Sequence, residues 1–225
     1  QPIDLRAAHG NFSATITEGS TDYTNVISLT HTVLAEQCTN ASYAQSDLLW
    51  AKAENLKAAV GGSGSQIVQL EFKHLLSKIE ITLVPADGEL YYTNADLAAA
   101  TVDILTVKTQ SVLDLVEGTA TTNATPTGNV RVKRSTDTEV GFDSDWLEAV
   151  VPPQTIAAKT AFIKVTLTTH HNRELYYQPS AAIEFEPNKL YRFTFSIASQ
   201  SITLTGLTVQ DGFAETTLEL IPQPA

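Results

Sequence analysis

The sequence predicts an all-β protein, a sandwich of short strands joined by Greek-key connections. Threonine, valine, isoleucine and tyrosine dominate the periodic segments, and most of these alternate apolar and polar residues with period two. That alternation is typical of strands half-buried on one face of a sheet. Turn-rich pieces such as PADGE, TNATPTGN and FEPNK separate the segments. Many short antiparallel strands at this spacing favour a sandwich.

The clearest strands lie in the second half of the chain. LYRFTFSI places Tyr191, Phe193, Phe195 and Ile197 on one face, and FIKVTLTT alternates in the same way. Further strands are expected at residues 102–107, 129–133, 146–151, 202–204 and 216–221.

Helix signals are few. The strongest predicts a helix over residues 46–59, capped by Ser46 or Asp47, although a strand through LLWAKA fits this stretch nearly as well. A second, short helix is expected at residues 94–100, behind an Asn or Asp cap.

The stretch LEFKHLLSKIEITL changes its alternation halfway. Its apolar residues fall on even positions up to Leu76 and on odd positions from Ile79 onward. One extra residue in a strand produces this change, so we predict a β-bulge at residues 75–78. The residues assigned to this core and bulge feature are Phe72, His74, Leu76, Ser77 and Lys78.

A flexible run, GGSGS at residues 61–65, divides the chain just before that stretch. It predicts a short N-terminal β region at residues 1–65, forming a partial or small domain, and a larger C-terminal sandwich at residues 66–225. The run lacks the Gly-Lys-Ser/Thr ending of a phosphate-binding loop.

The composition excludes several classes of function. Fourteen Lys and Arg stand against 25 Asp and Glu, a formal net charge of -11, so we expect no nucleic-acid partner. A single cysteine, Cys38, excludes an internal disulfide framework and a multi-cysteine metal site. The chain contains no methionine, so we expect a processed chain or one that lacks its leader.

Catalytic and metal-binding patterns are not evident. His74 lies on the apolar side of its strand, where a structural role is favoured over chemistry. His170 and His171 are neighbours that would point to opposite faces of a strand, and TTHHNRE predicts a hairpin loop. No nucleophile elbow, zinc-protease helix or catalytic cysteine context occurs. We therefore predict a non-enzymatic protein with no catalytic residues, no cofactor and no metal site.

Aromatic residues offer an alternative function, that of a lectin-like carbohydrate-binding surface module. Trp50, Trp146 and the pairs Tyr91-Tyr92 and Tyr176-Tyr177 are of a type that stacks on sugars. Ordinary places in a core or on a sheet face are the favoured interpretation of the same residues.

Four segments, in order along residues 47–213, resemble motifs of the fimbrillin-like family of Bacteroidia, the shaft, tip and anchor pilins of type V fimbriae. VQLEFKHLLSKIEITL is similar to the family's F-x-H-x-L-S-K strand, and VVPPQTI to its apolar-Pro-Gln segment. FEPNKLYRFTFSI is similar to the G-K-x-Y strand, with Asn188 in place of glycine. ITLTGLTVQDGF is similar to the closing I-x-D-W segment, with Gly212-Phe213 in place of tryptophan.

The resemblance implies transthyretin-like β-sandwich domains and export as a lipoprotein precursor to the cell surface, the outer membrane or a fimbrium. It also implies a role in adhesion and polymerisation with other fimbrial subunits, as a homo- or heteropolymer, by strand exchange. In that process an Arg-specific protease removes the first strand, and a strand of the next subunit fills the opened groove. A glycan or protein on a host or bacterial surface is a further partner that the resemblance suggests.

Two places in the chain fit these implied roles. Arg6 and Ala7 flank the candidate cleavage site, although an ordinary first strand with a solvated arginine fits equally, and Arg131 and Lys133-Arg134 compete with it. Leu218 and Leu220 are the alternate anchors of a candidate donor strand, whose alternative is a last strand paired within its own domain.

Overall fold

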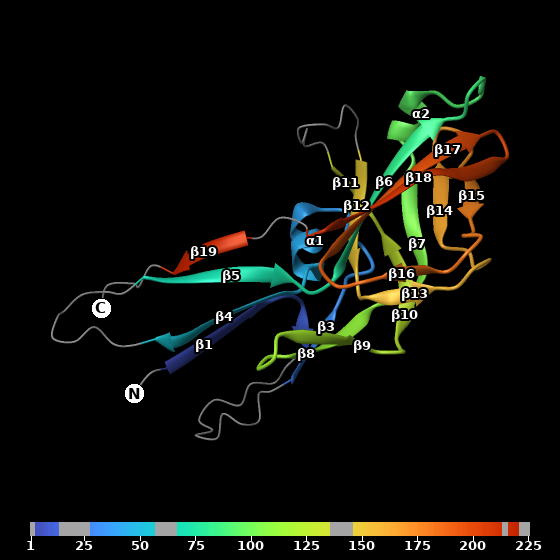
Figure 1. The fold of residues 1–225 in the computed structure, drawn as a ribbon. Helices are drawn as coiled ribbons and strands as arrows, with labels where there is room; N and C mark the ends of the chain where they lie inside the picture. The colour runs from blue at the N-terminus through green and yellow to red at the C-terminus, as the bar shows by residue number, and fades with distance from the viewer. Residues whose placement is uncertain (1–2, 14–27, 57–66, 136–145, 213–215, 221–225) are drawn as a thin grey trace.

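A computed structural model describes residues 3–13, 28–56, 67–135, 146–212 and 216–220. Over these residues the protein is mostly β, which confirms the predicted all-β class. Two of its sheets face each other as a sandwich, and another projects from the sandwich as an arm (Figure 1). GGSGS lies outside the described residues.

The sandwich consists of the β7 sheet and the β6 sheet, each named after one of its inner strands. The β7 sheet has the order β10-β7-β14-β15, built from Thr127–Arg131, Thr101–Lys108, Ile163–Leu167 and Arg173–Tyr177. The β6 sheet has the order β11-β12-β6-β17-β18, built from Lys133–Ser135, Trp146–Val151, Ser77–Pro85, Lys189–Ala198 and Ser201–Asp211.

The core lies between these two sheets. Phe193 and Phe195 of β17 face inward, together with Ile79 of β6 and Ile104 and Ile163 of the opposite sheet, and all are almost fully buried. Strand β17 lies parallel to β6, whereas the other paired strands are antiparallel. A parallel pair requires a long crossover connection, which the intervening β7 sheet provides.

Two smaller sheets close one end of the sandwich. The β8 sheet has the order β2-β3-β8-β9, from Phe12–Ser13, Ser28–Thr32, Gln110–Asp114 and Thr119–Thr122. The other joins β13, Gln154–Ile156, to β16, Ile183–Phe185.

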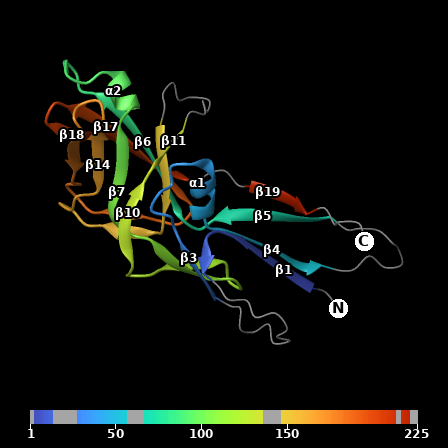
Figure 2. The ribbon, with the colours of Figure 1, turned by 180° about the vertical axis from the view of Figure 1, so that it is seen from behind.

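The arm sheet has the order β1-β4-β5-β19, from Ile3–His9, Leu49–Leu56, Val68–His74 and Thr216–Leu220. It extends away from the sandwich in both views (Figures 1 and 2). Strands from both sides of the predicted boundary at residues 65 and 66 therefore share one sheet. The β8 sheet likewise combines strands from before and after this boundary. Val33 and Leu48, which precede the boundary, belong to the main core.

The helix predicted over residues 46–59 is wrong, and the alternative strand is correct. Helix α1 covers Asn40–Ser46 and begins behind the Thr39 cap, whose side chain accepts a hydrogen bond from the Ser42 amide. The chain after Asp47 is strand β4, because Leu49, Ala51 and Ala53 alternate toward one apolar cluster. The second predicted helix is present as α2, Asn94–Ala98, but its cap is Thr93 and not an Asn or Asp, because the Thr93 side chain accepts from the Asp96 amide.

Candidate functional site

The candidate site is the arm sheet and its junction with the sandwich. One face of the arm carries its own apolar cluster, separate from the main core. Ala51 of β4 and Leu70 and Phe72 of β5 are buried there, and Leu5 and Ala7 of β1 pack against them. Burial of these side chains stabilises the arm by the hydrophobic effect, so β1 is held by both packing and backbone pairing.

Arg6 and Ala7, the candidate cleavage residues, lie in the middle of β1. Arg6 pairs with Lys52 of β4, and Ala7 pairs with Ala51. The Arg6 side chain is about a quarter exposed, and its polar contacts with other described residues are long, at 3.9 Å to Asp4 and 3.5 Å to the Val116 carbonyl. Strand β1 is the outermost strand of its sheet.

The competing basic residues are engaged more firmly. Arg131 forms an ion pair with Asp103, and Nζ of Lys133 lies 2.6 Å from Oε1 of Glu148. Arg134 donates hydrogen bonds to backbone carbonyls at 3.1 and 2.9 Å.

Leu218 and Leu220, the candidate donor-strand anchors, lie in β19 at the opposite edge of the arm. Leu218 pairs with Leu70 of β5, and Leu220 pairs with Val68, in antiparallel register. Strand β19 therefore completes the arm of its own chain in this structure.

The change of alternation in LEFKHLLSKIEITL marks a transfer between sheets, and the predicted bulge is not found. Strand β5 ends at His74 in the arm, and β6 begins at Ser77 in the sandwich. Leu75 and Leu76 cross from one to the other and are buried in the main core. The two strands turn their apolar sides to different clusters, so the alternation restarts.

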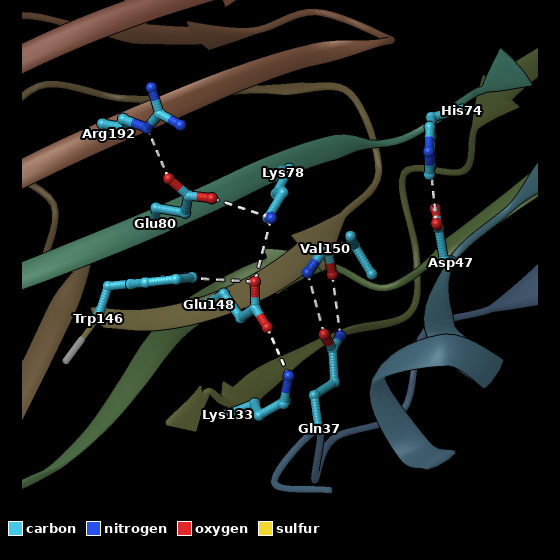
Figure 3. Close-up of polar contacts among 10 residues, drawn as sticks. All are labelled: Gln37, Asp47, His74, Lys78, Glu80, Lys133, Trp146, Glu148, Val150 and Arg192. Atoms are coloured by element: carbon cyan, nitrogen blue, oxygen red, sulfur yellow. Dashed lines mark hydrogen bonds and ion pairs between the residues drawn. The ribbon is translucent and has the colours of Figure 1, made fainter. Parts of the chain in front are cut away.

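Phe72 and His74 are buried in the arm, and Leu76 is fully buried at the crossing. His74 lies against Asp47, the residue that ends α1, with Nδ1 of His74 2.7 Å from Oδ2 of Asp47 (Figure 3). Ser77 donates a hydrogen bond to the Glu186 carbonyl at 2.7 Å. These contacts tie the end of β5 to the residue after α1, and the start of β6 to the segment before β17.

Lys78 belongs to a row of alternating charges on the face of the β6 sheet away from the core (Figure 3). Lys133 contacts Glu148, which also lies 3.1 Å from Lys78, and Lys78 lies 2.9 Å from Glu80. Nε of Arg192 completes the row, 2.7 Å from Oε2 of Glu80.

Burial in this row disfavours the charged forms of the side chains, and the neighbouring opposite charges favour them. For Lys78, burial lowers the pKa, but Glu148 and Glu80 together outweigh it and leave the pKa above its usual value. For Glu148, burial raises the pKa, and Lys78 and Lys133 outweigh it in the other direction. The row links β11, β12, β6 and β17 by ion pairs between neighbouring strands.

The aromatic candidates separate into buried and exposed residues. Trp50 and Trp146 are only 8% and 6% exposed, so neither offers a face to a ligand. Tyr92 is buried, whereas Tyr91 is 70% and Tyr176 is 49% exposed. His170 and His171 lie in a turn after β14, as predicted.

Sequence reasoning missed Asp47 as the partner of His74 and Glu148 as the centre of the charged row. Asp47 meets its partner across the junction of arm and sandwich, and Glu148 meets its partners across the β6 sheet. No pattern among neighbouring residues in the sequence predicts such contacts. Among the described residues no group of three or more His, Cys, Asp or Glu side chains is arranged to hold a metal ion. Nor does any helix in the described ranges reach the length and apolarity needed to cross a membrane.

One departure from the family motifs has a structural explanation. Asn188, which stands where glycine is usual, adopts a left-handed conformation with φ of 56°. Asparagine tolerates this conformation better than most residues. Its amide donates to the Leu76 carbonyl, and its own carbonyl accepts from Gly212, so three of the four motifs meet at this turn.

Solved structures share this fold. A candidate cell adhesion protein from Bacteroides uniformis has a TM-score of 0.62 at 24% identity, over 92% of this chain and 72% of the other. A candidate cell adhesion protein from Bacteroides ovatus has a TM-score of 0.62 at 16% identity, over 95% of this chain and 69% of the other. At these identities the likeness shows the fold alone.

A search of curated proteins found no match. The family model described as fimbrillin-like matches residues 1–211, most of the chain, in agreement with the ordered motifs. The chain therefore belongs to the fimbrillin-like family.

Proposed function

We propose that the chain is a non-enzymatic fimbrial subunit or accessory pilin of the cell surface that assembles by strand exchange and contributes to adhesion. Family membership supports the fimbrial and adhesive role. The mode of assembly, the lipoprotein precursor and the outer-membrane or fimbrial location go further and belong to this proposal.

The observation that carries the strand exchange is the position of β1. It is an edge strand whose Leu5 and Ala7 cover the apolar cluster of the arm. A cut after Arg6 releases Ile3–Arg6, the first half of the strand, and so uncovers the part of the cluster under Leu5 together with the backbone N–H and C=O groups of β4 that face those residues. An extended strand from another subunit covers the apolar cluster and pairs with the β4 backbone at the same time. This is the physical basis of β-augmentation.

The experiment exposes the purified chain to an Arg-specific protease and follows both cleavage and assembly. We expect N-terminal sequencing to find a new terminus at Ala7, and unboiled gels and light scattering to show a ladder of oligomers. Arg6→Lys keeps the charge but removes the protease site, so it should block both results. Arg173→Lys, which changes another exposed arginine, on β15, is the matched control and should change neither.

A second variant tests the donor strand. Deletion of residues 214–225 removes β19, so mixed assembly with the full chain should stop at one added subunit. Unchanged ladders from this variant would show that Leu218 and Leu220 are not the donor anchors. A cleaved chain that stays monomeric, alone and with other fimbrial subunits, would contradict the strand-exchange proposal.

A further inference from the structure

A wide-mouthed, open cavity of about 460 Å³ lies on the side of the sandwich away from the arm (Figure 1). It forms where β15, the last strand of the β7 sheet, approaches β18, the last strand of the β6 sheet. Its volume falls within the range of roughly 300–1,000 Å³ that small-ligand sites occupy. Seven residues line it: Tyr176, Tyr177, Gln178, Ser180, Ile202, Thr203 and Leu204.

The floor of the cavity is apolar and fixed to the core. The Tyr177 ring packs against Phe195, with ring centroids 4.9 Å apart. Ile202 and Leu204 pack against the main core cluster and are half-buried. A ligand with one apolar face therefore finds a preformed surface here.

Tyr176 is the exposed aromatic residue of the lining. Its hydroxyl donates a hydrogen bond to Oε2 of Glu174 at 2.5 Å, and Nζ of Lys164 lies 3.4 Å from the other oxygen of that carboxylate. These contacts restrain the ring while leaving it half exposed. A ring held in place loses little conformational entropy when a ligand stacks on it.

The rim is polar but uncharged. Gln178, Ser180 and Thr203 are exposed, and their amide and hydroxyl groups both donate and accept hydrogen bonds. The seven described lining residues carry no formal charge. The nearby cation, Lys164, already contacts Asp103 at 3.2 Å as well as Glu174. With a chain net charge of -11, an anionic ligand is disfavoured.

We propose that this cavity binds a neutral oligosaccharide. A pyranose ring has an apolar C–H face, which stacks on Tyr176, and a rim of hydroxyls, which pair with Gln178, Ser180 and Thr203. The inference names a ligand class for the adhesive role proposed above. It needs no assembly, because the site is complete within one chain.

The experiment uses the uncleaved monomer. Neutral oligosaccharides containing mannose, galactose, glucose or N-acetylhexosamine are arrayed beside their sialylated and sulfated counterparts, and the best neutral binder is measured by titration calorimetry. Tyr176→Ala should weaken its binding by about tenfold or more. Tyr176→Phe keeps the ring and should stay within about threefold of the unmodified chain. Ser180→Trp fills the cavity from an exposed position and should abolish binding.

Tyr91→Ala is the matched control, since Tyr91 is an exposed tyrosine outside the cavity and its loss should leave binding unchanged. Thermal melting confirms that each variant is folded. The proposal is overturned by an absence of binding on the whole array, by binding that Tyr176→Ala and Ser180→Trp leave intact, or by preference for the anionic glycans. An extended peptide that competes for the same residues would assign the cavity to strand docking instead.

The two proposals fail separately. If Arg-specific proteolysis produces no ladder, strand exchange is contradicted, but glycan binding by the monomer is unaffected. If no glycan binds, the saccharide-site proposal is wrong, and the proposal of assembly by strand exchange is unaffected.

Discussion

The imidazole of His74 and the carboxylate of Asp47 form a buried contact, with Nδ1 2.7 Å from Oδ2, at the point where the arm meets the sandwich. His74 is the last residue of β5, and Asp47 directly follows α1. The pair therefore joins the arm to the segment that leads into β4.

Asp47→Asn should destabilise the fold, because it replaces a charged hydrogen-bond acceptor beside a buried imidazole with a neutral amide. We expect the free energy of unfolding to fall by about 1–3 kcal/mol, measured by urea titration. The control is Asp87→Asn, in an exposed loop, which should change it by less than about 0.5 kcal/mol. Equal effects at both positions would remove any special role for the pair.

His31 predicts a dependence of stability on pH. It is fully buried, and burial lowers its pKa from 6.5 to about 4 against the smaller opposing effects of a backbone hydrogen bond with Gln45 and of the Asp47 charge. The nearby His9 adds to the lowering. Between these pH values His31 binds protons more readily in the unfolded chain than in the folded chain. Its contribution to stability is therefore fully present above pH 6.5 and is lost as the pH falls toward 4.

The loss assigned to His31 should reach about 3 kcal/mol across that window. His31→Leu should flatten the corresponding part of the stability curve, measured by urea unfolding at a series of pH values. His171→Gln, at an exposed turn, should keep the slope of the unmodified chain. A His31→Leu curve that parallels the original would show that other groups cause the slope.

Local alternation was enough to place strands such as β14 at Ile163–Leu167, because apolar and polar residues alternate along consecutive positions there. It was not enough for residues 46–59, where a helical cap and a strand pattern overlap and tertiary contacts decide. Nor did it show that β5 and β6, nearly continuous in the chain, belong to different sheets. Partner strands depend on contacts between distant residues, which a single sequence does not display.

The same reason limits what the sequence says about sites. Arg6 and Leu218 were proposed as candidates from their places near the two ends of the sequence, whereas the partnership of Asp47 and His74 depends on the folded junction. The cavity is made by β15 and β18, which read locally as ordinary strands. Tyr176 was noticed as an aromatic residue, and only the structure separates it from the buried tryptophans.

Glu148→Gln should be strongly destabilising, because Glu148 neutralises two partly buried lysines. Loss of the carboxylate leaves Lys78 and Lys133 with an unbalanced charge, and breaking a buried ion pair from one side costs about 3 kcal/mol or more. Chemical denaturation measures the loss. Because the pKa of Glu148 lies below its usual value in the folded chain, its contribution is present above the unfolded-state pKa and lost as the pH falls through the folded one.

A matched variant tests whether the row acts through pairing. Glu174→Gln changes a carboxylate on β15 whose lysine contact is more exposed and longer, at 3.4 Å. Its cost in the free energy of unfolding should be clearly smaller than that of Glu148→Gln, because solvent screens an exposed pair. If both variants cost the same, the buried row contributes no more than a surface pair.

Gly118→Ala tests how the β8 sheet is held against the base of the arm. Gly118 has φ of 67°, and a Cβ placed on it would lie 2.4 Å from Cε3 of Trp50. The Trp50 indole cannot retreat easily, because its Nε1 donates a hydrogen bond to the Leu115 carbonyl at 2.9 Å. We expect a loss of about 2–4 kcal/mol in the free energy of unfolding, from overpacking and backbone strain together.

Gly88→Ala separates the two contributions. Gly88 has a similar φ of 74°, but a Cβ there meets nothing within 4 Å. It should therefore show the backbone cost alone, about 1–2 kcal/mol. The difference between the two variants measures the contact with Trp50, and Trp50 fluorescence should shift only in Gly118→Ala. If the two losses are equal and the fluorescence is unchanged, the indole has room to move, and the close approach of the β8–β9 turn does not fix the base of the arm.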